Sequence, residues 1–428
     1  MPSPVQQFRT PLLWLLLPLM GGLGIAWICP PPPGGAWPLV LGAGAAALGA
    51  LIPACFRRPR LCLTALVLSA TLAGCGLLHL RHPRLHEASA RPPREVTLIV
   101  AVTHAFPAAP RARTVTGLGV VVGAGDFDRE LVGCRVYFSA IRQVSVPARR
   151  SARYTVRGVV EPMPRHIARG SFEDYLANLG IRHRLGRAQL TVEVSPPGRF
   201  QTFCDRTRDR LESILRRGLA SQPGIASIYL AMLLGEKAVL SVEQENAFMR
   251  SGTFHIFSIS GLHVGVIAAA LHHLFQFLRI PRRAAVVFTL SSLWLYVQIT
   301  GAGTPAMRAF LMVAFYLSAR AFRLPGNSFS ALTASALVIL LTDPLQLFSS
   351  GFQMSYTVVA ALILFGGPLG ERWQARWHPF ALKPRPEWRW WHAGLNWLGR
   401  QLIGAAAACW AAFLASVASG IGFFSLFS

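Results

Sequence analysis

Residues 61–80 read LCLTALVLSATLAGCGLLHL, a stretch with no acidic residue, lysine or arginine. A helix of about twenty apolar residues is long enough to cross the hydrocarbon core of a bilayer. The whole chain has the same bias, since 53% of its 428 residues are hydrophobic and 14% are charged. Soluble globular domains have about 25% charged residues, so we expect a polytopic α-helical membrane protein instead.

Apolar runs of this kind occur in two blocks. The N-terminal block predicts three spans, at residues 12–28, 37–56 and 61–80. The C-terminal block predicts six, at residues 254–278, 284–301, 305–322, 329–342, 351–369 and 401–427. The sequence therefore predicts about nine spans, of which the seventh is short for a full crossing.

Basic residues in the short loops predict the orientation of these spans, because such loops stay in the cytoplasm. Arg57, Arg58 and Arg60 lie between the second and third spans, whereas the loop before the second span has no charge. The N-terminus is then cytoplasmic, and residues 81–222 are extracytoplasmic. The later loops on the cytoplasmic side are basic as well: Arg279, Arg282 and Arg283; Arg320 and Arg323; Arg372, Arg376, Lys383, Arg385 and Arg389.

The extracytoplasmic stretch is itself strongly basic, with 24 arginines against 12 acidic residues in a chain of net charge +24. The orientation bias does not act on long translocated segments, so this charge favours an anionic partner. Anionic lipids and a polyanion such as single-stranded DNA both fit. The arginines that we expect to bind phosphates are Arg153, Arg157, Arg182, Arg184, Arg206 and Arg210.

Five β-branched stretches predict that this outer segment is a small β domain. They lie at residues 96–102, 114–122, 132–138, 154–160 and 190–194. Five short strands suit an oligonucleotide-binding (OB) type of barrel. A short helix is expected between the last two strands, with Ser171 and Asp174 as its N-cap pair and Gly180 as its stop.

The predicted organisation has four parts. They are a three-span segment at residues 1–80, an OB-fold-like domain at 81–199, amphipathic interfacial helices at 200–235 and a six-span channel domain at 236–428. The helix that begins at Phe200 has apolar residues at helical spacing and arginines on its other faces. It would lie on the outer membrane surface, either as a lipid anchor or as an arginine collar around a pore mouth.

Only two of the seven cysteines, Cys134 and Cys204, fall in the outer segment. In an oxidising compartment these two could form a disulfide. The chain has no CxxC pair, no phosphate-cradling lysine loop and no nucleophile elbow. We therefore expect no metal, no cofactor and no enzymatic activity.

The later spans are nearly free of charge. Asp343 is the only carboxylate between Ser251 and Gly370, and Arg308 is the only basic residue there outside the predicted cytoplasmic loops. A path for a polyanion should avoid carboxylates and can use an arginine as a transient phosphate site. The alternative is that Arg308 reaches out to the lipid headgroups.

The densest polar run in these spans is HIFSISGLHVG, residues 255–265. Residues three apart share a helical face, which pairs His255 with Ser258 and Ser260 with His263. Two histidines at this spacing lack the further ligands that zinc requires. We predict that a translocation path is lined or gated by His255, Ser258, Ser260, Gly261, His263, Arg308, Asp343, Gln353 and Ser355.

Three segments resemble the ComEC family of competence proteins. They are GEKAVLSVEQENAFMRSGTFHIFSISGLHVG at residues 235–265, GAGTPAMRA at 301–309 and DPLQLFSSGFQMS at 343–355. The stretch GSFEDYLANLGI, at 170–181, resembles the end of that family's outer OB domain. The resemblance implies a bacterial inner-membrane channel that passes one DNA strand into the cytoplasm during natural transformation.

The resemblance also implies partners. A periplasmic DNA receptor, a cytoplasmic translocation motor and membrane lipids are expected. A separate nuclease is expected as well, because the resemblance indicates a chain without the family's metallo-β-lactamase-like nuclease domain and its HxHxDH motif. Two other functions remain open from the residues alone. One is a secondary transporter for a small anion, and the other is an intramembrane hydrolase that uses Ser260 with His263.

Overall fold

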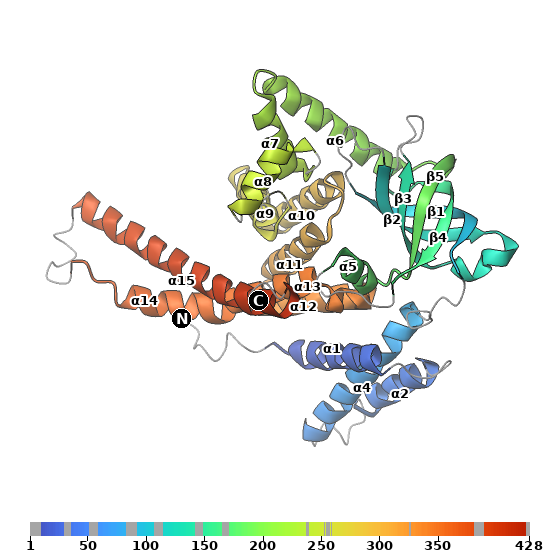
Figure 1. Ribbon diagram of the computed structural model, residues 1–428. Coiled ribbons are helices and arrows are strands. Elements are labelled where there is room, and N and C mark those ends of the chain that lie inside the picture. Colours follow the sequence, from blue (N-terminus) through green and yellow to red (C-terminus); the bar gives the residue numbers. More distant parts are fainter. Residues whose placement is uncertain are drawn as a thin grey trace.

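The computed structural model describes residues 10–29, 36–50, 59–82, 92–106, 114–141, 149–164, 171–236, 239–251, 253, 257, 259–324, 327–380 and 389–424. A five-stranded barrel stands beside a larger helical part, as Figure 1 shows. The N-terminal helices form a group of their own below, and α14 and α15 extend away from the barrel as a long hairpin (Figure 1).

The N-terminal group consists of α1 (Leu13–Ile28), α2 (Ala36–Ala50) and α4 (Pro59–Arg81). α1 and α4 approach closely because glycines occupy their crossing. A Cβ added at Gly22 would overlap the carbonyl oxygen of Thr71, and one added at Gly74 would lie 2.5 Å from the carbonyl oxygen of Leu19. The Cys75 thiol donates a hydrogen bond to the carbonyl of Gly22, at 3.1 Å. Small residues are the usual means by which membrane helices pack without a hydrophobic driving force.

The barrel is closed, in the strand order β1-β2-β3-β5-β4, which confirms the predicted small five-stranded β domain. Its strands are β1 (Arg94–Ala105), β2 (Thr114–Ala124), β3 (Arg135–Ile141), β4 (Arg153–Pro162) and β5 (His183–Ser195). β3 and β5 are parallel, and the other neighbours are antiparallel.

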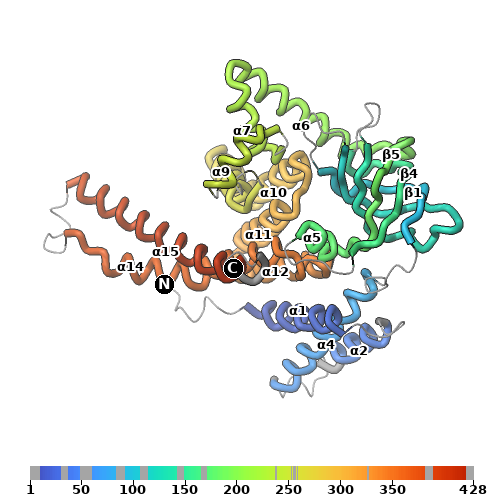
Figure 2. Tube along the Cα trace, viewed as in Figure 1, coloured from blue at the N-terminus to red at the C-terminus, as the bar shows by residue number. Residues whose placement is uncertain are grey.

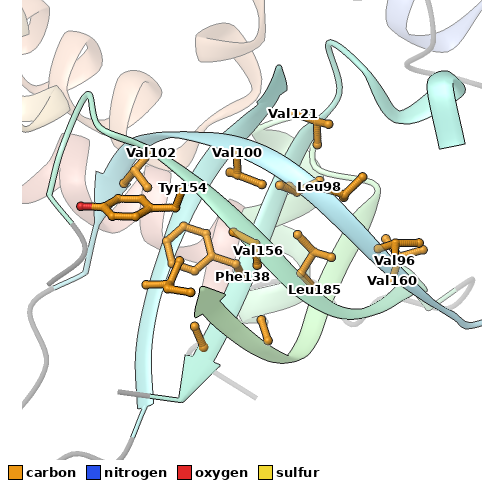
Figure 3. Close-up of a cluster of buried hydrophobic side chains, with 14 of the residues drawn as sticks. Val96, Leu98, Val100, Val102, Val121, Phe138, Tyr154, Val156, Val160 and Leu185 are labelled. Carbon is orange, nitrogen blue, oxygen red and sulfur yellow. The ribbon is translucent and has the colours of Figure 1, made fainter. Parts of the chain in front are cut away.

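Alternating residues fill the barrel. On β1 the inward side chains include Leu98 and Val100, which are fully buried, and Phe138 and Tyr154 meet them from β3 and β4 (Figure 3). Phe138 has room because Gly117 lies opposite it: a Cβ there would stand 2.5 Å from the ring. The period-two pattern of the sequence thus corresponds to an inner apolar face and an outer polar face.

Two strands, β3 and β5, begin three or more residues away from their predicted starts. β3 begins later than expected because Gly133, with φ of +85°, makes a turn immediately before it. β5 begins earlier, at His183. Its first half is hydrogen-bonded to β3 on one side and to β4 on the other, and this pairing forms the strand without β-branched residues. The predicted helix is confirmed as α5 (Phe172–Asn178), whose Ser171 cap accepts the Asp174 N–H at 3.1 Å.

Between the barrel and the later helices lie α6 (Arg199–Gly218), α7 (Pro223–Leu234) and α8 (Val242–Arg250). Cys204 is the buried residue of α6, whereas Phe200, Phe203 and Ile214 are more than half exposed. The helix is therefore amphipathic, with an apolar stripe that the described part of the chain leaves uncovered. Its proposed place on the membrane surface stays a prediction.

The remaining elements are α9 (Gly261–Phe277), α10 (Arg282–Ile299), α11 (Thr304–Ala321), α12 (Ser328–Thr342), η5 (Pro344–Phe348), α13 (Ser350–Ala361), the π-turn η6 (Leu362–Gly366), α14 (Gly367–Ala375) and α15 (Trp390–Phe424). α9, α10 and α11 share one buried cluster around Val264, Leu293 and Ala306. A second cluster joins α12 and α13 to the N-terminal α1 and α4. Figure 2 shows the resulting path, in which α1 runs beneath α12.

Three helices of the described residues are long and apolar enough to cross a membrane: Arg60–Arg81, Ser350–Ala375 and Trp390–Gly420. Five other apolar helices, among them Gly261–Phe277 and Ser328–Thr342, are shorter. The mostly helical, apolar architecture agrees with the prediction. The count of nine spans stays a prediction, because three helices of the described residues are long and apolar enough to cross.

The α1–α4 crossing is testable with two adjacent glycines. Gly22→Ala is expected to lower the free energy of unfolding by about 1–3 kcal/mol, because the new methyl group meets the backbone of α4. Gly21→Ala is the control, since nothing lies within 4 Å of a Cβ at that position. Thermal unfolding of the purified protein in detergent measures both. Equal effects of the two substitutions would contradict the close crossing.

Candidate functional site

Arg308 lies in the second turn of α11. The helix begins after a tight turn in which Gly301 and Ala302 have φ of +91° and +48°, and Pro305 occupies its first turn. Only 5% of Arg308 is exposed. The side chain is therefore held inside the protein, which contradicts the alternative that it reaches out to the headgroups.

The Arg308 guanidinium faces the start of α13. A Cβ at Gly351, in the first turn of α13, would be 3.5 Å from Nη2 and 3.8 Å from Nη1. Further along α13, Tyr356 is close enough for an electrostatic interaction with the guanidinium. The Tyr356 hydroxyl lies 3.1 Å from the Ser335 hydroxyl of α12. Three helices therefore meet around this one cation.

Arg308 has no carboxylate partner among the described residues, and its buried Nε has no hydrogen-bond partner there. The N-terminus of α13 also carries a partial positive charge, from its free backbone N–H groups. Two positive groups thus face each other, one on the buried Arg308 and one at the exposed Gly351. Such a pair is most stable when an anion binds between or beside them.

Ser260, Gly261 and His263 form the start of α9, beside α11. Ser260 is the N-cap; its N–H donates to His263 Nδ1 at 3.3 Å, and its hydroxyl lies 3.0 Å from the same atom. Gly261 lies against α11, with a Cβ there 3.8 Å from that of Ala309. The predicted shared face of Ser260 and His263 exists, and the contact satisfies the end of a helix.

The remaining residues that we predict to line the channel do not all lie near Arg308 in the described part of the chain. His255 and Ser258 lie outside the described residues. Gln353 donates from Nε2 to the carbonyl of Leu347 at 2.7 Å, which ties η5 to α13. Ser355 is half-buried on α13.

Asp343 lies at the joint between the barrel and the helical part, and not beside Arg308 as a common lining would require. Its carboxylate is 3.4 Å from Arg135 Nη2 of β3 and 3.6 Å from His82 Nε2, just after α4. Gln346 donates to it at 3.2 Å. Burial alone would raise the pKa of Asp343, but the contacts with His82, Arg135 and Gln346 outweigh it and lower the pKa to about 2.

The six arginines that we expect to bind phosphate are distributed over the barrel and α6. They lie on three elements: Arg153 and Arg157 on β4, Arg182 and Arg184 at the start of β5, and Arg206 and Arg210 on α6. Arg157 is paired with Glu95 at 2.7 Å, and Arg184 with Glu173 at 3.4 Å. Paired arginines have less charge to offer a phosphate, so the predicted basic surface is weaker than the sequence suggests.

The possible disulfide between Cys134 and Cys204 is wrong, because both residues are thiols. Cys134 lies beside η2 (Asp126–Leu131), which binds Arg94 at the start of β1. Cys204 lies on α6, near Arg150.

The sequence around several residues of these sites does not predict their contacts. Arg135 is one arginine among many, and only the alternation of β3 places it on the outer face of the barrel. Tyr356 and Ser335 resemble the polar residues that commonly bridge membrane helices. No group of three His, Cys, Asp or Glu side chains that suits a metal occurs in the part of the chain that the structure describes.

Comparison with known proteins identifies the helical part. Residues 232–428 match the family described as competence protein. This part of the chain is similar to the competence protein family. It includes α9 to α15 and therefore Arg308, Gly351 and Tyr356, so the family resemblance that the sequence predicts is confirmed.

Three curated relatives align with about a third of this chain. ComE operon protein 3 of Bacillus subtilis is 37% identical over 142 residues, which are 33% of this chain and 18% of that protein. Competence protein ComA of Neisseria gonorrhoeae is 31% identical over 142 residues (31% and 20%). Recombination protein 2 of Haemophilus influenzae is 26% identical over 148 residues (33% and 19%). The chain thus matches about a fifth of the length of each relative, and no solved structure matches it.

The joint at Asp343 should depend on pH. Because the folded-state pKa is about 2 against an ordinary 3.8, the charged carboxylate stabilises the fold by on the order of 2 kcal/mol. This stability is present above about pH 4 and is lost as the pH falls through 2. Asp343→Asn is expected to lower the melting temperature at pH 7, and its difference from the wild type should shrink between pH 4 and pH 2.

Asp209→Asn is the control for this experiment, since Asp209 is exposed on α6. Melting in detergent across the acid range gives both comparisons. A difference between wild type and Asp343→Asn that stays constant from pH 7 to pH 2 would show that the carboxylate charge does not hold the joint.

Proposed function

We propose that this chain forms the channel through which a single strand of DNA crosses the bacterial inner membrane into the cytoplasm during natural transformation. Its helical part matches the competence protein family, and the relatives carry names that refer to competence and to recombination. The proposal extends these family-level facts to a substrate and a direction of transport.

The observation that carries the proposal is the buried, uncompensated Arg308 against the first turn of α13. Between Ser251 and Gly370 the only carboxylate is Asp343, and it is engaged at the joint with the barrel. A phosphate that enters this region meets a guanidinium fork and helix N–H groups without a competing acid. A proton or cation path would need the opposite arrangement, with carboxylates along it.

The other parts of the chain fit around this path in the proposal. The barrel and α6 lie on the extracytoplasmic side, with the N-terminus in the cytoplasm and about nine spans in all. α6 rests on the outer leaflet through its exposed apolar stripe, where anionic lipids meet its arginines. We infer that a periplasmic DNA receptor delivers the strand, that a cytoplasmic motor draws it inward, and that a separate nuclease removes the other strand.

We propose no catalytic role for Ser260 and His263. Their contact is explained by the cap of α9, and no carboxylate among the described residues forms an ion pair with His263 to orient it. The pair instead supports the start of α9 next to Ala309, one residue from Arg308. His255 and Ser258, which lie outside the described residues, remain proposed path residues on the strength of the sequence alone.

Substitution of Arg308 tests the function. Arg308→Ala is expected to reduce DNA uptake by at least tenfold, because a lost charged hydrogen-bond donor is worth about 1.5–3 kcal/mol at a desolvated site. Arg308→Lys should recover only part of the uptake, since a point charge replaces a planar fork. Transformation frequency is the readout, with membrane abundance measured in parallel.

Arg320→Ala provides the matched control, because Arg320 lies on the same helix but is exposed and donates to Tyr316 at 3.1 Å. Loss of uptake at normal abundance for Arg308→Ala alone supports the proposal. Wild-type transformation by Arg308→Ala contradicts it. Uptake of a small anion, but not of labelled DNA, by the wild-type protein would favour a small-anion transporter instead.

The orientation has its own test. A reporter fused after Gly180 should be active on the extracytoplasmic side, and one fused after Ala381 on the cytoplasmic side, because the basic short loops determine the orientation. A cytoplasmic signal at Gly180 would reverse the proposed direction of transport.

A further inference from the structure

Aromatic side chains gather outside the barrel core, between β3 and α5. The ring of Tyr137 lies 5.4 Å from that of Phe172 at an interplanar angle of 76°, and Phe172 stacks on Tyr175 at 6.0 Å. Phe106, just after β1, joins them at 6.4 Å from Phe172 and 6.5 Å from Tyr137. We call these four residues the aromatic cluster.

The aromatic cluster is not required to fill the barrel. On β3 the side chains of Val136, Phe138 and Ala140 point inward and are buried, so Tyr137 points outward. None of the four rings is a member of the buried barrel core. Phe172 and Tyr175 remain 45% and 44% exposed, which is unusual for large rings that already contact one another.

Arginines surround the cluster on the same face. Arg184 pairs with Tyr137 across the β3–β5 ladder, and its guanidinium carbon lies 5.8 Å from the centre of the Tyr137 ring. Arg135 is two residues from Tyr137 on the same outer face of β3. Arg182 is half-buried, and its Nε has no hydrogen-bond partner in the described part of the chain. The face therefore combines exposed rings with cations.

The aromatic cluster also lies on the side of the barrel that meets the helical part. Arg135 reaches Asp343 at the start of η5, and it donates to the carbonyl of Leu179 at 3.0 Å, just after α5. α5 lies between the barrel and the helices α11 to α13 (Figure 1). The segment that follows Asp343 leads through η5 to Gly351, against which Arg308 is placed.

We propose that the aromatic cluster, with Arg182 and Arg184, is a stacking platform for the unpaired bases of single-stranded DNA, which it holds before the strand enters the helical part. This inference rests on the proposed function, since it names where the same substrate first binds. Every base has a flat face, so stacking on exposed rings captures a strand without reading its sequence. Nearby arginines supply the phosphate contacts that such platforms combine with stacking.

The position of the cluster favours DNA over a lipid surface as its ligand. A lipid-binding patch should continue onto other exposed apolar side chains, whereas this one is bounded by charged residues, among them Glu173 and Arg184. A membrane-interface role remains a distinguishable outcome of the test.

The test compares two ligands that differ only in their bases. The full chain in phosphatidylcholine nanodiscs is titrated, by fluorescence anisotropy, with labelled oligo-dT of about 12 nucleotides and with an abasic strand of equal length. Phe172→Ala with Tyr175→Ala is expected to weaken oligo-dT binding by about tenfold or more and to leave abasic binding unchanged. The single variant Phe172→Tyr, which keeps a ring, should bind like the wild type.

Phe127→Ala is the matched control, since Phe127 is 90% exposed on η2 of the same barrel. The platform is overturned if the double variant binds oligo-dT as tightly as the wild type, or if it loses both ligands equally. It is also overturned if the double variant changes only the melting temperature in nanodiscs containing phosphatidylglycerol, because that result indicates a lipid contact.

The same variants separate this inference from the proposed function. If Arg308→Ala abolishes transformation while the double α5 variant binds oligo-dT and transforms normally, the platform fails and the channel function stands. If the wild type binds oligo-dT through these rings but transports no DNA, the platform stands and the channel function fails.

Discussion

The ion pairs of Asp343 determine how the two halves of this protein fit together. One carboxylate contacts an arginine from the barrel, Arg135, and a histidine from the end of α4, His82. A partly buried charge is costly unless it is paired, and removing one member leaves the others uncompensated. The end of α12, the barrel and the N-terminal helices therefore meet at this carboxylate, in addition to the apolar contacts of α1 and α4 with α12 and α13. Any movement of the barrel relative to the helices must first exchange or hydrate these contacts.

This use of Asp343 has a consequence for the membrane part. Because the only carboxylate of residues 251–370 is engaged with the barrel, Arg308 has no acid to neutralise it among the described residues. The two contacts are therefore linked: Asp343 binds Arg135 of the barrel, and Arg308 keeps a positive charge that a phosphate can bind. An acidic residue near Gly351 would pair with Arg308 and repel phosphate, so the absence of acids is as informative as the presence of the arginine.

Much of the fold follows from patterns that are local in the sequence. Alternation along β1 and β3 predicts the barrel, and the Ser171–Asp174 cap predicts α5, because these depend on neighbours a few residues away. The contact of Arg135 with Asp343 joins residues far apart in the chain, and no spacing rule reaches that far. The same limit explains the errors at Cys134 and Cys204, whose shared compartment says nothing of their distance.

The candidate DNA-binding surface shows how composition alone overstates charge. An excess of arginine predicts phosphate binding, but pairing with Glu95 or Glu173 removes part of the charge of Arg157 and Arg184. Stacking rings offset that loss without adding charge, and their contribution depends less on salt than a phosphate contact does. For a strand that must move on, several weak sites of different chemistry are better than one strong site, because transport requires release as well as capture. The exposed rings of α5 and the buried Arg308 are two such sites, at successive positions along one proposed path.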